Sequence, residues 1–335
     1  MYAAALALLL FCGAASAMFG AASVSFADTV KILMSRVPLV GPMISLEGVT
    51  GPSVTIVLLV RLPRVVMAMA AGSALSVSGA AYQGMFRNSM ADPYVLGISS
   101  GASAGAAIGA VLNAHLSQYV NLVPLLAFAG AIVATLLVYN FGRVGSKVPV
   151  TTLLLSGIAV SFIMSSVMTL AMVLNRDQAN RIIFWTLGSF TAASWKNLYI
   201  VLPVCMIGVI IVMFFSRDLD AMMSGDDAAR TLGVEVERLK KILLGVTSLM
   251  VAIVVSSCGV IGFVGLVIPH ISRLLIGPAH RRLLPLSALL GALFLLLCDL
   301  AARMIMPPAE IPIGVITALC GSPFFIYLLQ KAKRR

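Results

Sequence analysis

The residue types that carry out chemistry in proteins occur in this sequence, but their spacing matches no catalytic or metal site. The 335 residues include 12 Asp and Glu, 3 His and 5 Cys. The cysteines stand singly inside apolar runs, which is typical of small buried side chains rather than of disulfides or metal ligands. No GxxxxGK[ST] phosphate loop and no HExxH motif occurs. We therefore expect a chain that is not an enzyme by itself and that binds no metal or cofactor.

Charge is concentrated instead in residues 216–241, which read SRDLDAMMSGDDAARTLGVEVERLKK. Eleven charged residues gather in this stretch: Arg217, Asp218, Asp220, Asp226, Asp227, Arg230, Glu235, Glu237, Arg238, Lys240 and Lys241. A segment this polar is expected in water, between parts of the chain that lie in a membrane. Two interpretations are open: a connector through which a soluble partner acts on the membrane part, and a solvated connector without a partner.

Composition places the chain among polytopic membrane proteins. Hydrophobic residues make up 60% of it and charged residues 10%, whereas soluble proteins average about half and about a quarter. The net charge of +11 does not indicate nucleic-acid binding, because the basic residues stand at the ends of apolar segments without interleaved aromatic residues. Taking about 20 apolar residues for each bilayer crossing, we predict an all-α fold of about ten transmembrane helices in a single domain, residues 1–335. The predicted spans are roughly 2–22, 65–83, 94–112, 121–141, 151–174, 198–215, 242–262, 264–276, 283–302 and 311–329.

The distribution of Lys and Arg predicts the orientation. An even number of spans places both termini on one side, and fifteen of the 23 basic residues fall on that side against eight on the other. The positive-inside rule then places both termini and residues 216–241 in the cytoplasm. Residues 1–23 lack the basic n-region of a secretory signal, because Lys31 is the first basic residue. We therefore expect a retained first transmembrane helix.

Four glycines recur at intervals of four residues in the third predicted span: Gly97, Gly101, Gly105 and Gly109. At this spacing they form one stripe along a helix, where a neighbouring helix can approach closely. We assign this stripe to helix packing.

Hydroxyl and methionine side chains form two adjacent rows in the fifth predicted span. The rows comprise Ser161, Ser165 and Thr169, and Met164, Met168 and Met172; Ser73, Ser76 and Gln83 are close at helical spacing in the second span. The hydroxyls can bond back to carbonyls of their own helix. Alternatively, these faces line a path for a large, partly apolar solute, for which methionine provides an adaptable surface. No carboxylate lies near the middle of a span, which disfavours an ion-coupled transporter.

Three longer stretches together resemble one family. They are residues 61–103 (RLPRVVMAMAAGSALSVSGAAYQGMFRNSMADPYVLGISSGAS), 258–277 (CGVIGFVGLVIPHISRLLIG) and 299–331 (DLAARMIMPPAEIPIGVITALCGSPFFIYLLQK). With LGV at 232–234, the chain resembles the FecCD, or BtuC-like, permeases of ABC importers over essentially its whole length. The resemblance implies a homodimer of ten-helix permeases in the bacterial or archaeal inner membrane. It also implies two cytoplasmic ATP-binding subunits, which hold ATP and Mg²⁺, and a periplasmic or lipid-anchored substrate-binding protein.

The resemblance further implies roles for individual residues. Arg61, Arg64 and Arg303 match the outer arginines that meet acidic residues of the binding protein; interfacial snorkelling is the alternative. Thr151 and Thr152 match the cytoplasmic gate, although the run here begins with Pro149 and Val150 and is less hydroxyl-rich than in the cobalamin member. The residues that match the coupling helices, with Gly233 as a helix end, are Ala228, Ala229, Arg230, Thr231, Leu232, Gly233 and Val234.

We therefore predict an ABC importer permease for a metal chelate, either an iron–siderophore complex or heme. Cobalamin is the alternative within the family, an ion-coupled secondary transporter is the alternative from another class, and a non-transporting membrane scaffold is the third. The sequence does not name the solute, because related permeases carry different cargo along similarly lined paths.

Overall fold

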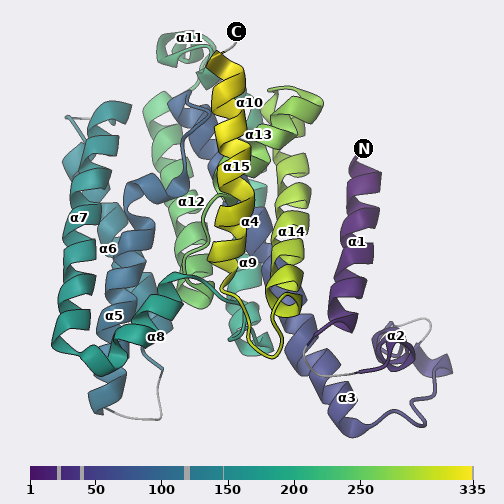
Figure 1. Ribbon diagram of the computed structural model, residues 1–335. Helices are drawn as coiled ribbons and strands as arrows, with labels where there is room; N and C mark the ends of the chain where they lie inside the picture. The colour runs from purple at the N-terminus through teal and green to yellow at the C-terminus, as the bar shows by residue number, and fades with distance from the viewer. Residues whose placement is uncertain (21–23, 38–40, 117–120, 146, 334–335) are drawn as a thin grey trace.

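The computed structural model of the chain describes residues 1–20, 24–37, 41–116, 121–145 and 147–333. Long helices run side by side between the two ends of a bundle, and short helices and loops join them (Figure 1). Within the described residues no β-strand forms, and the nearest approach to one is an isolated bridge between Val144 and Lys147. The prediction of an all-α fold is confirmed.

Each predicted span overlaps one long helix. These helices are α1 (Tyr2–Met18), α4 (Leu62–Phe86), α5 (Ile98–Leu116), α6 (Val123–Gly142), α7 (Val150–Leu174), α9 (Trp195–Phe214), α12 (Val236–Cys258), α13 (Val264–Ile276), α14 (His280–Met304) and α15 (Ile313–Lys333). The connecting elements are α2 (Phe26–Met34), α3 (Gly51–Thr55), α8 (Arg176–Thr186), α10 (Ser216–Met223), α11 (Asp226–Thr231), the short helices η1 (Gly41–Met43) and η3 (Pro93–Leu96), and a π-helix, η2 (Ile56–Arg61).

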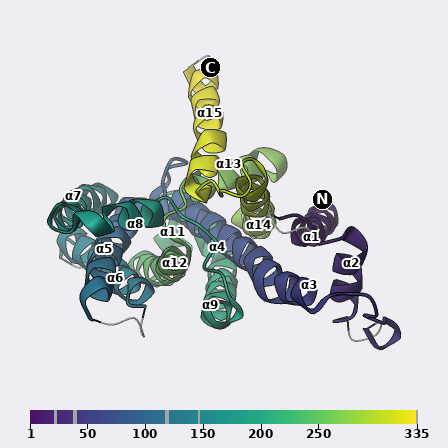
Figure 2. The same ribbon diagram turned by 60° about the horizontal axis from the view of Figure 1, so that its bottom comes forward.

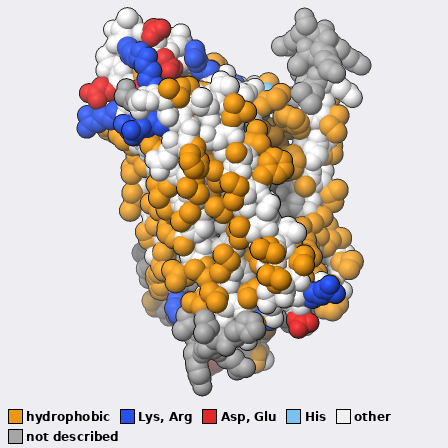
Figure 3. All heavy atoms as spheres, turned by 90° about the vertical axis from the view of Figure 1, so that its left-hand side faces the viewer, with side chains coloured by type: hydrophobic (Ala, Val, Ile, Leu, Met, Phe, Trp, Pro, Cys, Tyr) orange, Lys and Arg blue, Asp and Glu red, His pale blue; other side chains and the backbone are white. Residues whose placement is uncertain are grey.

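Six helical segments of the described chain are long and apolar enough to cross a membrane. They are α6, α7, α9, α12, α14, and α4 together with the preceding α3 and η2. The remaining four, α1, α5, α13 and α15, are apolar but shorter, so the number of ten crossings stays a prediction. Figure 3 shows hydrophobic side chains across the middle of one face and charged side chains near its two ends, as expected for a bilayer-embedded bundle.

The two ends of the bundle differ in what they carry. The N-terminus of α1 and the C-terminal end of α15 both point toward the end at which α10 and α11 lie (Figure 1). We call this the connector end, and we call the opposite end, where α8 lies and α3 projects, the loop end. Assignment of the connector end to the cytoplasm remains the prediction of the positive-inside rule.

Helix α4 passes through the middle of the bundle, and Figure 2 shows neighbours on both sides of it. Gly72 faces the backbone of Gly291 on α14, where an added Cβ would overlap the carbonyl. Ser73 donates to the Ala288 carbonyl at 2.9 Å, and Ser76 donates to the Ser287 carbonyl at 2.7 Å. Such hydrogen bonds between membrane helices each contribute about 0.6–2 kcal/mol. Ser73 and Ser76 therefore hold α4 against α14.

The glycine stripe lies between α5 and α6. A Cβ on Gly101 or Gly105 would overlap a carbonyl oxygen of α6, and Gly109 lies against the backbone of Val123. Gly97 differs from the sequence expectation, because it precedes α5 and ends η3 with a left-handed φ of 72°. The left-handed turn, rather than the packing of α5, requires glycine at position 97.

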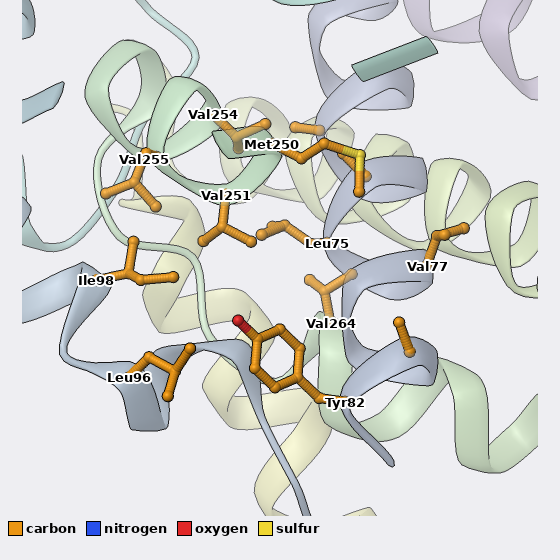
Figure 4. Packing of buried hydrophobic residues seen from close by; sticks show 14 of the residues in the cluster. Leu75, Val77, Tyr82, Leu96, Ile98, Met250, Val251, Val254, Val255 and Val264 are labelled. Atoms are coloured by element: carbon orange, nitrogen blue, oxygen red, sulfur yellow. The ribbon is translucent and has the colours of Figure 1, made fainter. Parts of the chain in front are cut away.

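Buried apolar residues of α4, α12 and the start of α5 meet in one core (Figure 4). Tyr82 is fully buried there, and its hydroxyl lies 3.4 Å from that of Ser248. The seventh predicted span extends four residues too far, because α12 ends at Cys258 and Gly259 takes a φ of 73°. The non-helical backbone that follows is held by the Tyr94 hydroxyl, which donates to the Ile261 carbonyl at 2.9 Å. A buried partner of this kind is what unwound backbone needs at membrane depth.

Candidate functional site

The predicted coupling segment forms a small projection at the connector end. Helix α11 ends in a left-handed turn, with a φ of 87° at Gly233. The amide of Gly233 donates to the Arg230 carbonyl, and that of Val234 donates to the Ala229 carbonyl, both at 3.0 Å. This pair of bonds is the Schellman arrangement that closes a helix with glycine. The turn leaves Leu232 outside, with 71% of its surface exposed.

A buried lysine holds this projection to the bundle. Lys240, on α12, is 4% exposed and donates to the Asp226 carboxylate at 2.6 Å. Arg87 lies 4.0 Å from the other oxygen of Asp226, and Glu237 accepts from the Val148 amide at 3.1 Å. Lys240 thus differs from the solvated charges expected throughout residues 216–241. Its charge is buried and paired, so it fixes where α11 begins.

A second ionic cluster lies at the loop end. Arg64 donates through Nε to Asp299 at 2.8 Å, and through both Nη atoms to the two oxygens of Glu310 at 3.0 and 2.9 Å. Arg303 reaches the other oxygen of Asp299 at 3.1 Å. Asp299 is 0% exposed, and a carboxylate without water is tolerated only when it is paired in this way. The cluster ties together α4, α14 and the loop that follows α14.

Glu310 connects this cluster to the loop between α8 and α9. Thr191 donates to Glu310 Oε2 at 3.1 Å. Partial burial opposes ionisation of Glu310, but the hydrogen bonds and charge of Arg64 outweigh it and lower the pKa of the carboxyl. Glu310 is therefore an anion at neutral pH and holds Thr191 and Arg64 in one place.

Two of the outer arginines, Arg61 and Arg303, also contact the end of α1. Arg61 donates to the Met18 carbonyl at 2.7 Å, and Arg303 donates to the Phe19 carbonyl at 2.9 Å and to the Ser16 hydroxyl at 2.6 Å. Arginine at a helix C-terminus satisfies carbonyls that lack a partner in the helix. Arg61, Arg64 and Arg303 are only 4%, 7% and 5% exposed. The structure thus shows all three in internal contacts, a role that the sequence did not predict.

The hydroxyl and methionine rows of α7 face different surroundings. Ser161 and Ser165 line a groove of about 530 Å³ together with Phe86, Met90 and Val150. From Val150 to Ser165 this groove follows α7 for about 22 Å, at 1.5 Å per residue. Met168 and Met172 pack instead against buried residues of α5 and α8. Met164 packs on the main core.

Two hydroxyls near the groove are occupied by backbone partners. Thr169 donates to the Ser165 carbonyl at 2.9 Å, as expected for a hydroxyl within a helix. Thr152 donates to the Gly142 carbonyl at 2.6 Å and joins the end of α6 to the start of α7. Thr151 is exposed next to Val150, at the connector end of the groove. Of the two gate candidates, Thr151 is therefore the one whose side chain is exposed.

Metal-ligating side chains do not come together in the described part of the chain. No group of three or more His, Cys, Asp or Glu residues there could hold a metal ion. His280 bonds to Asp220 at 2.7 Å through Nδ1, and its amide donates to the same oxygen, which joins α10 to the start of α14. This contact makes Asp220 an anchor for α10.

Comparison with known proteins places these features in context. The profile of the FecCD transport family matches residues 8–331. The cobalamin import permease BtuC of Halobacterium salinarum is 41% identical over 288 residues, covering 86% of this chain and 77% of the relative. The Fe(3+) dicitrate permease FecD of Escherichia coli is 38% identical over 273 residues (82% and 84%), and the hemin permease HmuU of Yersinia pestis is 37% identical over 283 residues (82% and 83%).

A solved structure described as an inward-facing metal-chelate type ABC transporter is also similar. It superposes with a TM-score of 0.84 at 29% identity, and the match covers 98% of both chains. The two folds therefore correspond along almost the whole length of both chains.

Proposed function

This chain belongs to the FecCD transport family of ABC importer permeases, and we propose that it carries a metal chelate across the inner membrane while partner subunits hydrolyse ATP. Metal chelate here means an iron–siderophore complex, heme or cobalamin. The relatives for cobalamin, ferric dicitrate and hemin are 41%, 38% and 37% identical, so the comparisons support cobalamin as well as the iron complexes. The chain itself contributes the path and the contacts, and the ATP and Mg²⁺ belong to the partners.

The observation that carries this proposal is the geometry of α11. An apolar side chain such as Leu232, held 71% exposed at the tip of a rigid turn, is unfavourable in water unless a partner covers it. Lys240 and Asp226 anchor the base of the projection, so a force applied at Leu232 is transmitted to α12. Residues 228–234 are therefore the proposed contact with the ATP-binding subunit.

At the loop end, the proposed partner is a substrate-binding protein. Arg64 and Arg303 pair with the carboxylates of Asp299 and Glu310, and Arg61 donates to the end of α1. Burial of the three arginines supports a role in fixing the outer rim to which the partner docks. The three arginines thus support the proposed docking surface from inside and do not form its exposed contacts.

A second copy of the chain is proposed to complete the path. Helix α7 is apolar along its length, yet only 11% of its most hydrophobic window is buried inside one chain. Phe162 is 71% exposed on this helix and also lines the groove of Ser161 and Ser165. A homodimer that covers α7 would enclose the groove between two copies, with Thr151 at its connector end as the proposed gate.

The test is uptake into proteoliposomes that contain the permease, its ATP-binding subunit and its binding protein. Heme, a ferric siderophore and cobalamin are offered separately, with ATP or a non-hydrolysable analogue inside. We expect uptake of one of the three that requires hydrolysable ATP and persists without a sodium or proton gradient. Uptake that follows an ion gradient and ignores ATP would support a secondary transporter and contradict the proposal.

A further inference from the structure

A second cavity of the chain has no part in the transport path described above. It has a volume of about 980 Å³ and is lined by residues of α5, α6, α8, α9 and α12 and of the loop before α9. These helices lie beside one another at the loop end of the bundle (Figure 2). We call it the five-helix cavity. It shares no lining residue with the groove along α7, and its volume is at the upper end of the range for ligand pockets, about 300–1,000 Å³.

The charge of the five-helix cavity is positive. Arg181 on α8 and Lys196 on α9 both line it, and no Asp or Glu does. Within the described residues neither cation forms an ion pair or a hydrogen bond. Arg64 and Arg303, by contrast, are both paired with Asp299. Both side chains of the cavity, Arg181 and Lys196, are exposed, so water screens their mutual repulsion, and together they give the opening of the cavity a positive potential that attracts anions.

The polarity of the lining changes with depth. On α9 the lining passes from Lys196 to Val201, and on α12 it passes from Ser257 at the helix end to Ile253. Each step of four or five residues corresponds to about 6–8 Å at 1.5 Å per residue. The cavity is therefore polar at the level of the helix ends and apolar one turn or more further in. A phospholipid has the same order, with a polar headgroup at the level of the helix ends and an apolar acyl chain further in.

The cavity also opens toward the membrane-facing surface. Leu125 of α6 and Ile200 of α9 belong to its lining, yet they are 63% and 60% exposed. Because these side chains lie on helices that are long and apolar enough to span a bilayer, their exposed surfaces face acyl chains. Trp185 lines the same cavity, and tryptophan prefers the depth of lipid headgroups.

We propose that the five-helix cavity binds one acidic phospholipid, with the phosphate between Arg181 and Lys196 and the start of an acyl chain along Val201 and Ile253. The chemistry that the cavity recognises is an anionic phosphate joined to an apolar chain. A free phosphate ester has the first half alone, and a zwitterionic lipid has no net charge to offer the two cations.

Native mass spectrometry of the detergent-purified full-length permease tests this proposal. The probes are dioleoylphosphatidylglycerol, dioleoylphosphatidylcholine and glycerol 3-phosphate. We expect one phosphatidylglycerol to be retained in preference to phosphatidylcholine, and Arg181→Gln or Lys196→Gln to weaken its binding about fivefold each. Ile253→Phe narrows the apolar part and is expected to weaken binding of the lipid without a change of charge.

Arg176→Gln is the matched control, because Arg176 lies on the same helix as Arg181 but does not line the cavity. It should leave lipid retention within twofold of the unchanged chain. Equal retention of phosphatidylcholine would overturn the proposal, as would equal weakening by Arg176→Gln or unchanged retention in the double variant Arg181→Gln/Lys196→Gln. Binding of glycerol 3-phosphate as tight as that of phosphatidylglycerol would assign the cavity to a free anion and would also overturn it.

Discussion

Replacing Lys240 by Met is expected to release α11 from the bundle while leaving the transmembrane helices folded. Lys240 is 4% exposed, so the apolar Met of similar length fits the same space. What is lost is the 2.6 Å contact with Asp226 at the first residue of α11. Asp226 then keeps only Arg87, whose nearest atom is 4.0 Å away.

The magnitude follows from the surroundings of the pair. A hydrogen bond between charged groups contributes about 1.5–3 kcal/mol. Asp226 is partly exposed, with 31% of its side chain accessible, so water replaces part of what Lys240 supplied and the lower end of this range applies. About 1.5 kcal/mol corresponds to a roughly tenfold fall in the ratio of anchored to detached α11.

The assay is the affinity of the permease for its ATP-binding subunit, followed by ATP-dependent uptake in proteoliposomes. Lys241→Met is the matched control, because Lys241 is the next residue and is exposed. We expect the ATPase affinity to fall by up to about tenfold for Lys240→Met, the limit reached when detached α11 predominates, and by less than twofold for Lys241→Met. Asp226→Asn should weaken binding by itself and add little to Lys240→Met, because both remove one interaction.

Two results would refute this reasoning. One is an affinity for Lys240→Met that equals that of Lys241→Met, since the anchor would then have no effect on the contact. The other is full additivity of Asp226→Asn and Lys240→Met, which would show that the two residues act separately. A thermal unfolding curve for each variant identifies any loss that results from general unfolding.

Three further predictions concern other parts of the chain. Leu232→Asp places a charge on a side chain that is already exposed, so the melting temperature should stay unchanged while ATPase affinity falls at least tenfold; retained affinity would contradict the contact. Arg64→Met removes a partner from the fully buried Asp299 and should cost about 3–5 kcal/mol of stability, more than Arg64→Lys; equal melting temperatures of the two variants would count against the buried pair. Burial raises the pKa of Asp92 to about 6 from 3.8. Between about pH 4 and 6 the folded chain therefore holds a proton on Asp92 that the unfolded chain releases. The free energy of unfolding falls as pH rises through this range. Asp92→Asn should remove that part of the slope when thermal unfolding is followed from pH 4 to 7, and an unchanged slope would show that Asp92 does not cause it.

The helices were predictable because each depends on its own residues. An apolar run such as residues 151–174 must form a helix in a bilayer, where every backbone group needs an internal hydrogen bond, and α7 occupies Val150–Leu174. Boundaries were less accurate where glycine interrupts an apolar run. Gly97 and Gly259 both take left-handed φ values and end elements, and hydrophobicity does not distinguish such a glycine from one that lies within a helix.

The partners of charged side chains were not predictable in the same way. Arg303 and Asp299 are four residues apart on one helix, a spacing that suggests a pair, but Arg64 lies 235 residues from Asp299 and 246 from Glu310. The partner of Lys240 was likewise not predictable, because Asp226 lies 14 residues away in the sequence. The expectation that the outer arginines face a partner rested on the family resemblance, whereas their burial depends on which helices surround them.

The sequence by itself determined the all-helical membrane fold, the place of each long helix, the charged connector and the family. These properties are local or additive: hydropathy sets the spans, and long motifs in the right order set the resemblance. Only the tertiary structure decided that Lys240 anchors α11, that three outer arginines lock α1, α4 and α14 together, and that Arg181 and Lys196 share a cavity. Such features join residues from distant segments, and the physical reason is that burial and ion pairing depend on three-dimensional neighbours that no local pattern specifies.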